Sequence, residues 1–262
     1  MIHPSAIINE SAQIDKNVEI GPFCIIGEGV KINAGTILKS HVVIDGDTTI
    51  GKNNTIFPFT TIGVVPQDLK FRGEKSQLVI GDNNMIREHV TIHLGTQDGG
   101  MLTQIGSNNL LMVGVHIAHD CKVGNHVILA NNATLAGHVE VGDHVVIGGL
   151  SAIHQFVRIG NYAMIGGMSG VESDVIPFGL VMGERASLAG LNLVGMKRNN
   201  ISRDEIHALR NFYKLVFGEK ISENFVERSS KIAQEFPNNS TVKEVVNFIN
   251  SETSRSFCQP KN

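Results

Sequence analysis

The sequence predicts an all-β solenoid with a C-terminal α-helical domain, and three patterns support this fold class. An aliphatic residue recurs every six positions through most of the chain, and a small or β-branched residue follows it four positions later. Gly, Asn and Asp often stand between them, as in tight turns. Beyond residue 177 the repeat gives way to helical spacing. A period of six suits a chain that coils as a triangular prism with one short strand per face, which predicts a parallel β-helix.

The aliphatic repeat defines the extent of the solenoid. Its three runs cover residues 2–62, 80–92 and 105–171. Each hexad supplies two inward residues to a narrow core, and its polar residues face water. We therefore predict a solenoid at residues 1–176. Residues 177–262 should form an irregular segment and a helical domain, because the open end of a solenoid needs a cap.

The repeat is interrupted twice, near residues 64–78 and 94–104. Across the first interruption the in-phase positions are Asp68 and Glu74, whose charges would lie unpaired in a core. Across the second, the flanking aliphatic residues are thirteen apart, one more than two hexads, which predicts a smaller protrusion. Both segments should loop out of the solenoid. Loops on a rigid scaffold often carry function.

The C-terminal part begins with a Gly-rich segment, residues 178–201, which we expect to be irregular. Apolar residues at helical spacing follow it. The pattern predicts helices over residues 202–217, 222–236 and 241–250, with capping boxes formed by Ser202 with Glu205 and by Thr241 with Glu244.

Composition narrows the range of functions. A net charge of −3 gives no general electrostatic basis for binding nucleic acid or a membrane surface. No apolar run reaches transmembrane length, and the repeat begins at residue 2, which leaves no room for a signal peptide. Three cysteines form no paired framework, so a reducing cytoplasm is expected.

Counting in coils locates a candidate site. Three hexads make one coil, so residues eighteen apart should stack about 4.8 Å from each other. His126 and His144 stack in this way on one edge, and His41 and His89 share another turn position; we interpret all four as polar turn residues. A different edge gathers polar side chains from three adjacent coils, with a glycine that leaves the backbone open: His116, His119, Asp120, Gly137, His138, His154 and Gln155.

Three chemistries could use this cluster. His119, oriented by the neighbouring Asp120, could act as a general base, and the N–H of Gly137 could stabilise an oxyanion. Alternatively, three imidazoles could bind zinc and leave one position open. A third possibility is a nucleophilic Cys121. Its inward phase in the hexad argues against that role, and we interpret Cys121 as a core residue.

The strings His116-Ile-Ala-His119-Asp120-Cys121, Gly137-His138 and Ile153-His154-Gln155-Phe156 closely resemble the UDP-N-acetylglucosamine O-acyltransferases of lipid A biosynthesis. The resemblance covers roughly residues 1–215. It implies a left-handed β-helix and a homotrimer with active sites between subunits. It also implies transfer of a 3-hydroxyacyl chain from acyl carrier protein to the glucosamine 3-OH of UDP-N-acetylglucosamine, the first step of lipid A biosynthesis. No metal or other cofactor is implied, because the donor chain is carried on the phosphopantetheine of the carrier protein.

The same resemblance assigns roles to individual residues. His119 matches the general base, Asp120 its supporting carboxylate, and Gly137 the amide that stabilises the oxyanion. A glycine at 167 matches the position that limits acyl chain length, which implies a long chain of about fourteen carbons or more. The other matched positions line the substrate cleft: Asp68 and Lys70 near the sugar, His116, His138, His154 and Gln155 along the nucleotide-sugar and pantetheine cleft, and Asn192 and Arg198 near the nucleotide.

Two positions depart from the family pattern. Val194 stands where the family commonly has Glu, and Asn199 where it often has a second Arg. Both positions are associated with nucleotide contacts, so the way in which UDP is held is open.

Three different functions compete with this O-acyltransferase activity. The nearest is that of the N-acyltransferase that acts later in the same pathway, although that enzyme carries an extra N-terminal domain. A second is that of a zinc-dependent hydratase resembling γ-carbonic anhydrase on the same scaffold. The third is a solenoid that binds ligands without catalysing a reaction.

Overall fold

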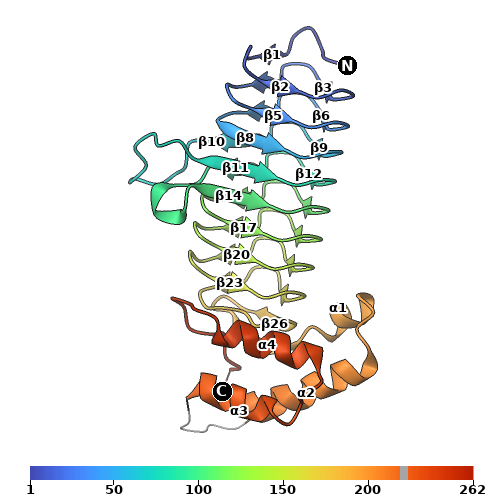
Figure 1. The fold of residues 1–262 in the computed structure, drawn as a ribbon, viewed down its shortest axis with the longest axis vertical. Helices are drawn as coiled ribbons and strands as arrows, with labels where there is room; N and C mark the ends of the chain where they lie inside the picture. Colours follow the sequence, from blue (N-terminus) through green and yellow to red (C-terminus); the bar gives the residue numbers. More distant parts are fainter. Residues whose placement is uncertain (219–223, 262) are drawn as a thin grey trace.

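The computed structural model describes residues 1–218 and 224–261. Its strands coil as a left-handed parallel β-helix with three flat faces, and helices cover the C-terminal end (Figure 1). This confirms the predicted fold class. Consecutive strands lie on consecutive faces, and in the regular coils each strand pairs in parallel with the strand eighteen residues on, as Ile7 does with Ile25.

The described strands form three sheets, one for each face. The nine-stranded sheet contains β1 (Ile7–Ile8), β4 (Ile25–Ile26), β7 (Val43–Ile44), β10 (Thr61–Val64), β13 (Thr91–His93), β16 (His116–Ile117), β19 (Thr134–Leu135), β22 (Ala152–Ile153) and β25 (Gly170–Val171). The eight-stranded sheet contains β2 (Gln13–Ile14), β5 (Lys31–Ile32), β8 (Asp47–Ile50), β11 (Gln77–Ile80), β14 (Leu102–Ile105), β17 (Lys122–Val123), β20 (Glu140–Val141) and β23 (Arg158–Ile159). The ten-stranded sheet contains β3 (Glu19–Ile20), β6 (Ile37–Leu38), β9 (Thr55–Ile56), β12 (Met85–Ile86), β15 (Leu110–Leu111), β18 (Ile128–Leu129), β21 (Val146–Ile147), β24 (Met164–Ile165), β26 (Gly179–Met182) and β27 (Ser187–Leu191).

The core consists of the two inward residues that each hexad supplies. The second residue of each two-residue strand from β3 to β25 is buried, as Ile44 and Ile117 illustrate, and the small position four residues on is buried as well. Cys121 occupies such a small position and is fully buried, and burial raises the pKa of its thiol to about 12. A buried thiol with this pKa is not a nucleophile at neutral pH, which supports its interpretation as a core residue.

The three edges of the prism differ in character. We call the edge between the nine- and eight-stranded sheets the site corner (residues 118–121, 136–139 and 154–157). The edge between the eight- and ten-stranded sheets is the ladder corner, where buried Asn54, Asn84 and Asn109 pass hydrogen bonds from coil to coil. The third edge is the apolar corner, whose exposed side chains include Phe23, Phe59, Leu150 and Met168.

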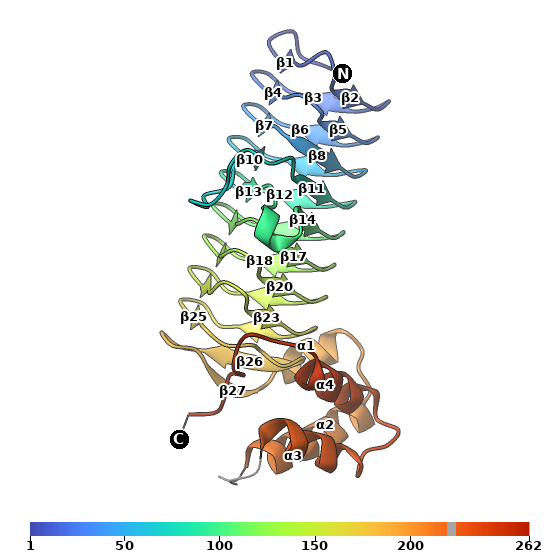
Figure 2. The same cartoon turned by 60° about the vertical axis from the view of Figure 1, so that its left-hand side comes forward.

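Both insertions leave the solenoid at the site corner and project to the same side of it (Figures 1 and 2). The first insertion (residues 65–76) separates β10 from β11, so that Ile80 pairs with Ile50, thirty residues earlier. The second insertion (residues 94–101) contains the short 3₁₀ helix η1 (Gln97–Gly99). Ile105 pairs with Ile80, twenty-five residues earlier, so the coil that contains this insertion is seven residues longer than a regular coil of eighteen. The thirteen residues from Ile92 to Ile105 thus replace a single hexad rather than two, because β13 and β14 lie on consecutive faces.

The segment at residues 178–201 is ordered, contrary to the expectation that it is irregular. β26 extends the ten-stranded sheet in parallel beside β24, and β27 turns back antiparallel to it. Helix α1 (Leu193–Arg198) follows. The hexad count did not predict these two strands, because the antiparallel β27 covers the edge of the sheet instead of continuing the coil.

The helical domain consists of α2 (Arg203–Phe217), α3 (Phe225–Ala233) and α4 (Ser240–Asn250). Ser202 caps α2 as predicted, but the Glu205 carboxylate accepts hydrogen bonds from the N–H groups of Ser240 and Thr241, at the start of α4. The predicted cap at Thr241 was wrong, because Asn239 caps α4.

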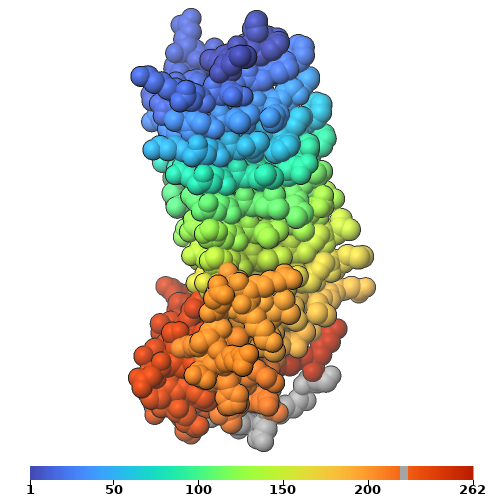
Figure 3. All heavy atoms as spheres, turned by 90° about the vertical axis from the view of Figure 1, so that its right-hand side faces the viewer, coloured from blue at the N-terminus to red at the C-terminus, as the bar shows by residue number. Residues whose placement is uncertain are grey.

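These helices lie at the C-terminal end of the solenoid, where they form the broad base of the molecule in Figure 3. The predicted start of the second helix at Ser222 lies outside the described residues. None of the helices within the described ranges is long and apolar enough to span a membrane.

Candidate active site

The site corner brings together the histidines that the coil count predicted. The rings of His119 and His138, from adjacent coils, meet edge to face with their centroids 5.0 Å apart. His138 in turn stacks on Phe156, one coil further on, at 4.4 Å. His116 precedes this corner on β16, where its Nδ1 lies 2.7 Å from the Thr91 hydroxyl. Of the predicted edge, His119 and His138 are therefore in direct contact across adjacent coils.

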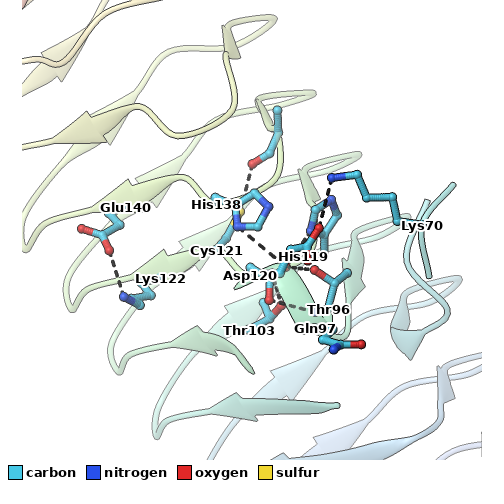
Figure 4. Close-up of polar contacts among 12 residues, drawn as sticks. Lys70, Thr96, Gln97, Thr103, His119, Asp120, Cys121, Lys122, His138 and Glu140 are labelled. Carbon is cyan, nitrogen blue, oxygen red and sulfur yellow. Dashed lines mark hydrogen bonds and ion pairs between the residues drawn. The ribbon is translucent and has the colours of Figure 1, made fainter. Parts of the chain in front are cut away.

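His119 and Asp120 form the central pair. The Nδ1 of His119 lies 2.7 Å from the Oδ2 of Asp120, and His138 Nδ1 lies 3.9 Å from the same oxygen. The Asp120 side chain is fully buried, although the coil count had placed it on an outward-facing corner. It is buried because the second insertion covers it, with Thr96 in direct contact (Figure 4).

Burial and hydrogen bonding set the charges of this cluster. Burial alone would raise the pKa of Asp120, but hydrogen bonds from His119 and Thr96 outweigh it and hold the pKa below its usual range. Desolvation lowers the pKa of His138 and of His116. The site thus combines the ionised Asp120 carboxylate with His116 and His138 imidazoles that are neutral at neutral pH, surroundings suited to proton transfer.

Gly137 leaves its backbone open beside the base. No acceptor among the described residues takes a hydrogen bond from the Gly137 N–H. A Cβ at this position would lie 2.5 Å from His119 Cε1 and 2.7 Å from its Nε2, so the imidazole packs directly on the glycine. An unpaired amide beside a histidine is an arrangement that can stabilise an oxyanion while the histidine moves a proton.

The loop residues predicted to meet the sugar lie in the first insertion. Lys70 is exposed, and its ammonium pairs with Asp98 of the second insertion at 3.0 Å. The Asp68 carboxylate accepts a hydrogen bond from the Lys70 N–H, which shapes the turn. The charges of Asp68 and Asp98 act to raise the pKa of His138, so both loops lie close to the histidine cluster.

Several predicted site residues lie elsewhere in this chain. Gly167 is exposed at the apolar corner, next to Met168. Asn192 caps α1, where its side-chain amide donates to the Tyr162 carbonyl, and Arg198 is exposed in the last turn of that helix. Within one chain these three residues do not join the cluster around His119.

Sequence reasoning missed three residues at the site. His93, at the end of β13, is buried, and its ring meets that of His116 edge to face at 4.9 Å. Desolvation, together with the neighbouring His116 and His119, lowers the pKa of His93 to about 4. Thr96 binds Asp120 from the second insertion. The signal for His93 was its place directly after Ile92, where the hexads often have glycine.

The third missed residue, Arg255, comes from the C-terminal segment. After α4 the chain returns to the solenoid, and Phe257 pairs with Asp174. One guanidinium nitrogen of Arg255 lies 2.7 Å from His154 Nδ1, and its Nε donates to the Gln155 carbonyl at 3.1 Å. The same segment, through Glu252, Thr253 and Ser254, lines a pocket together with the second insertion and the site corner. The residues from those two parts include Gly99, Asp120, His138 and Phe156. Such a long-range contact leaves no trace in a repeat count.

The donor atoms of His119, Asp120 and His138 lie within 4.8 Å of one another, close enough to hold a metal ion. Most of these donor atoms, however, already take part in hydrogen bonds within the protein. Asp120 Oδ2 faces His119 Nδ1 and accepts from the Thr96 hydroxyl, and its Oδ1 accepts from the Thr96 N–H. The donor set is therefore organised as a hydrogen-bonded histidine–aspartate pair.

Comparison with known proteins agrees with this geometry. Residues 174–258 match the family model described as UDP N-acetylglucosamine O-acyltransferase, domain 2, and residues 5–40 and 102–137 match the bacterial transferase hexapeptide model. The chain is 56% identical over 257 residues to the acyl-[acyl-carrier-protein]–UDP-N-acetylglucosamine O-acyltransferase of Rickettsia canadensis, with 98% of this chain and 97% of that protein covered. The chain belongs to the UDP-N-acetylglucosamine O-acyltransferase family.

Other members of the UDP-N-acetylglucosamine O-acyltransferase family share its architecture. The solved structure of LpxA from Acinetobacter baumannii superposes with a TM-score of 0.95 at 47% identity, covering 98% of this chain and 99% of that one. The Arabidopsis UDP-N-acetylglucosamine acyltransferase superposes with a TM-score of 0.87 at 38% identity, over 99% and 100% of the two chains. The similarity therefore includes the helical domain, beyond the limit near residue 215 that the sequence motifs indicated.

Proposed function

We propose that this chain transfers a 3-hydroxyacyl chain from acyl carrier protein to the glucosamine 3-OH of UDP-N-acetylglucosamine, the first step of lipid A biosynthesis. Relatives that match nearly the whole chain are named for this activity. The observation that carries the proposal is the His119–Asp120 pair packed against the open backbone of Gly137. That geometry supplies a base and an oxyanion site side by side.

The reaction then follows from the chemistry of the donor. With Nδ1 facing Asp120, the Nε2 of His119 is free to take the proton of the sugar hydroxyl as its oxygen attacks the thioester carbonyl. The Gly137 N–H stabilises the oxyanion of the tetrahedral intermediate. Collapse of the intermediate releases the pantetheine thiolate, which takes the proton back from His119. A thioester is already activated, so no covalent acyl-enzyme and no metal or other cofactor is needed.

Substrate contacts are proposed for the remaining matched residues. Asp68 and Lys70 of the first insertion meet the sugar, and Lys70 exchanges its Asp98 partner for substrate. His116, His138, His154 and Gln155 line the cleft for nucleotide sugar and pantetheine. Asn192 and Arg198 hold the nucleotide, since a guanidinium suits a diphosphate.

A homotrimer would complete the site. The apolar corner exposes a line of large apolar side chains, including Phe23, Phe59, Leu150 and Met168, each more than half exposed. Large exposed apolar side chains gathered along one edge are a feature of protein interfaces. The apolar corner of a neighbouring subunit, packed beside the site corner of the first, would bring its Gly167, and its α1 residues, toward the cleft of the first. In this arrangement the solenoid, residues 1–176, builds the acyl-transfer cleft, and residues 177–262 form the domain that caps it. The proposed place of action is the cytoplasm.

A zinc-dependent hydratase is the second candidate, because the donor atoms of His119, Asp120 and His138 lie within 4.8 Å of one another. Incubating purified protein with UDP-N-acetylglucosamine and a panel of 3-hydroxyacyl carrier proteins, followed by mass spectrometry, separates the two. We expect the nucleotide sugar to gain the mass of the acyl chain, with the ester on the 3-OH and no loss of rate in chelator. Absence of acylated sugar, with stoichiometric zinc and carbon dioxide hydration, would favour the hydratase.

A further inference from the structure

The Asp120 carboxylate is held from outside the hexapeptide coils. Both of its oxygens accept hydrogen bonds from Thr96, Oδ1 from the backbone N–H at 2.8 Å and Oδ2 from the hydroxyl at 2.5 Å. Both residues are buried, with Thr96 2% and Asp120 3% exposed. Apart from the Thr96 bonds, His119 Nδ1 is the nearest partner of this carboxylate. A buried charge depends strongly on its hydrogen bonds, so Thr96 supplies much of what keeps Asp120 ionised.

The backbone of the second insertion is shaped to cover this carboxylate. A Cβ at Gly99 would overlap the Asp120 carboxyl group, so the glycine lets the loop lie directly on it. Asp120 is also fixed from its own side, because its N–H donates to the Thr103 hydroxyl at 2.8 Å. Figure 4 shows Thr96 of the second insertion and Thr103 of β14 lying beside Asp120. Water is excluded on this side, which strengthens each hydrogen bond.

The second insertion is in turn tied to the first. Glu74 accepts hydrogen bonds from the N–H groups of Arg72 and Gln97, at 2.8 and 3.2 Å, and so joins the two loops. Gln97 directly follows Thr96. The loop proposed to meet the sugar and the loop that covers Asp120 therefore form one hydrogen-bonded unit.

We propose that Thr96 is a positioning residue of the reaction: its hydroxyl and N–H hold Asp120 so that the carboxylate orients His119. This inference rests on the proposed function for its effect on rate. Thr96 touches no reacting atom and acts through Asp120. The second insertion thus contributes to the reaction by holding the Asp120 carboxylate in place.

The kinetic test compares Thr96→Val with Thr96→Ser, because valine keeps the shape of threonine without the hydroxyl and serine keeps the hydroxyl. We expect Thr96→Val to lower kcat by roughly tenfold or more, a part of the contribution of general-base catalysis, with little change in the KM of either substrate. Thr96→Ser should restore kcat to within about threefold of wild type. The matched control is Thr36→Val, which removes another buried hydroxyl, bonded to the Gly51 carbonyl at the ladder corner, and should leave kcat unchanged.

A double-mutant cycle tests whether Thr96 acts through Asp120. In the Asp120→Asn background, Thr96→Val should lower kcat by no more than about twofold, because residues in one network are not additive. Full additivity, or an unchanged kcat in Thr96→Val alone, would overturn the proposal.

A readout independent of the reaction keeps the two proposals separable. The carboxylate of Asp120 has a lowered pKa, so its bonds stabilise the fold above the ordinary value of 3.8 and lose that effect as pH falls through the folded value. The melting temperature of Thr96→Val should therefore approach that of wild type as pH is lowered from 7 to 3. The groups facing Asp120 are His119 and His138, with Asp68, Asp98 and His116 nearby, and these are common to both proteins. If wild type makes no acylated sugar, the proposed function fails, and a melting difference that is absent at pH 7 still refutes the role of Thr96.

Discussion

Two edges of the same prism carry pairs of histidines in contact across adjacent coils, and they use them differently. At the ladder corner His126 stacks on His144 and His144 on Tyr162, with interplanar angles of 6° and 3° and centroids 4.7 Å apart. At the site corner the rings of His119 and His138 are nearly perpendicular, at 89°. The regular edge stacks aromatic faces for packing, and the interrupted edge turns one ring toward a buried carboxylate.

The difference comes from a single turn position. One position in each corner turn has a left-handed backbone, with φ near 60°, and it is occupied by His126, His138 and His144. At that position each ring stacks on a ring of an adjacent coil. In the coil of His119 that position is taken by Asp120, with φ of 59°, and the histidine stands one residue earlier. A histidine displaced from the ladder position, beside an acid and above a glycine, is what distinguishes the site. Asn and Asp are among the residues that tolerate this φ, so Asp120 fits the turn.

After removal of His119 itself, the largest effect on the site corner is expected when the Asp120 carboxylate is neutralised. Asp120→Asn should lower kcat by about a hundredfold or more, since an amide orients and stabilises an imidazolium poorly. The Asp120 carboxylate should stabilise the wild-type fold relative to Asp120→Asn at neutral pH, and this difference should disappear as pH falls through the lowered pKa of Asp120. Steady-state kinetics and thermal melts from pH 3 to 7 measure both effects.

The matched control for this variant comes from the ladder corner. Asp143→Asn changes a carboxylate that accepts from the Asn125 N–H. It should alter melting without an equal loss of kcat. Comparable kcat losses in the two variants would remove the distinction between the corners.

Closing the open backbone should have the next largest effect. In Gly137→Ala the added Cβ would crowd the His119 ring and the proposed oxyanion position, so we expect kcat to fall by roughly a hundredfold. Gly124→Ala, where a Cβ would lie 2.5 Å from Asp143 Oδ1 at the ladder corner, provides equivalent crowding away from the site. An active Gly137→Ala enzyme would argue against the oxyanion role.

A change of specificity rather than rate is expected at the apolar corner. A Cβ at Gly167 would meet only the Gly149 backbone, with its oxygen at 3.3 Å, so a larger side chain can be accommodated toward solvent or a neighbouring subunit. Gly167→Met should shift the preferred donor toward shorter acyl chains. Competition between 3-hydroxyacyl carrier proteins of different lengths measures the shift, and an unchanged preference would separate Gly167 from the acyl pocket.

The smallest effect is expected where the C-terminal segment meets the site corner. Arg255 holds His154 through Nδ1 and the Gln155 carbonyl, so Arg255→Ala should raise a substrate KM about threefold to tenfold with little change in kcat. Arg210→Ala, which changes an exposed arginine of α2, serves as control. Unaltered KM values for both substrates would show that the segment only caps the solenoid.

The coil count predicted much of this arrangement because a repeat fixes which residues share an edge. It brought His119, His138 and Gln155 together and set His126 and His144 apart. It failed where the period fails. The burial of Asp120 depends on an insertion of irregular length, and Arg255 arrives from a hundred residues away. No local pattern encodes Thr96 above Asp120, because that contact is decided by how the loop folds back.

The most direct test of the account is the rate of acyl transfer in His119→Ala and His126→Ala, assayed together by mass spectrometry with UDP-N-acetylglucosamine and a 3-hydroxyacyl carrier protein. Loss of the base should reduce turnover by about a thousandfold or more, with the oligomer and melting profile preserved. His126→Ala should turn over at the wild-type rate while melting slightly earlier. Retained activity in His119→Ala, or equal losses in both, would contradict the division of the prism into a catalytic and a structural edge.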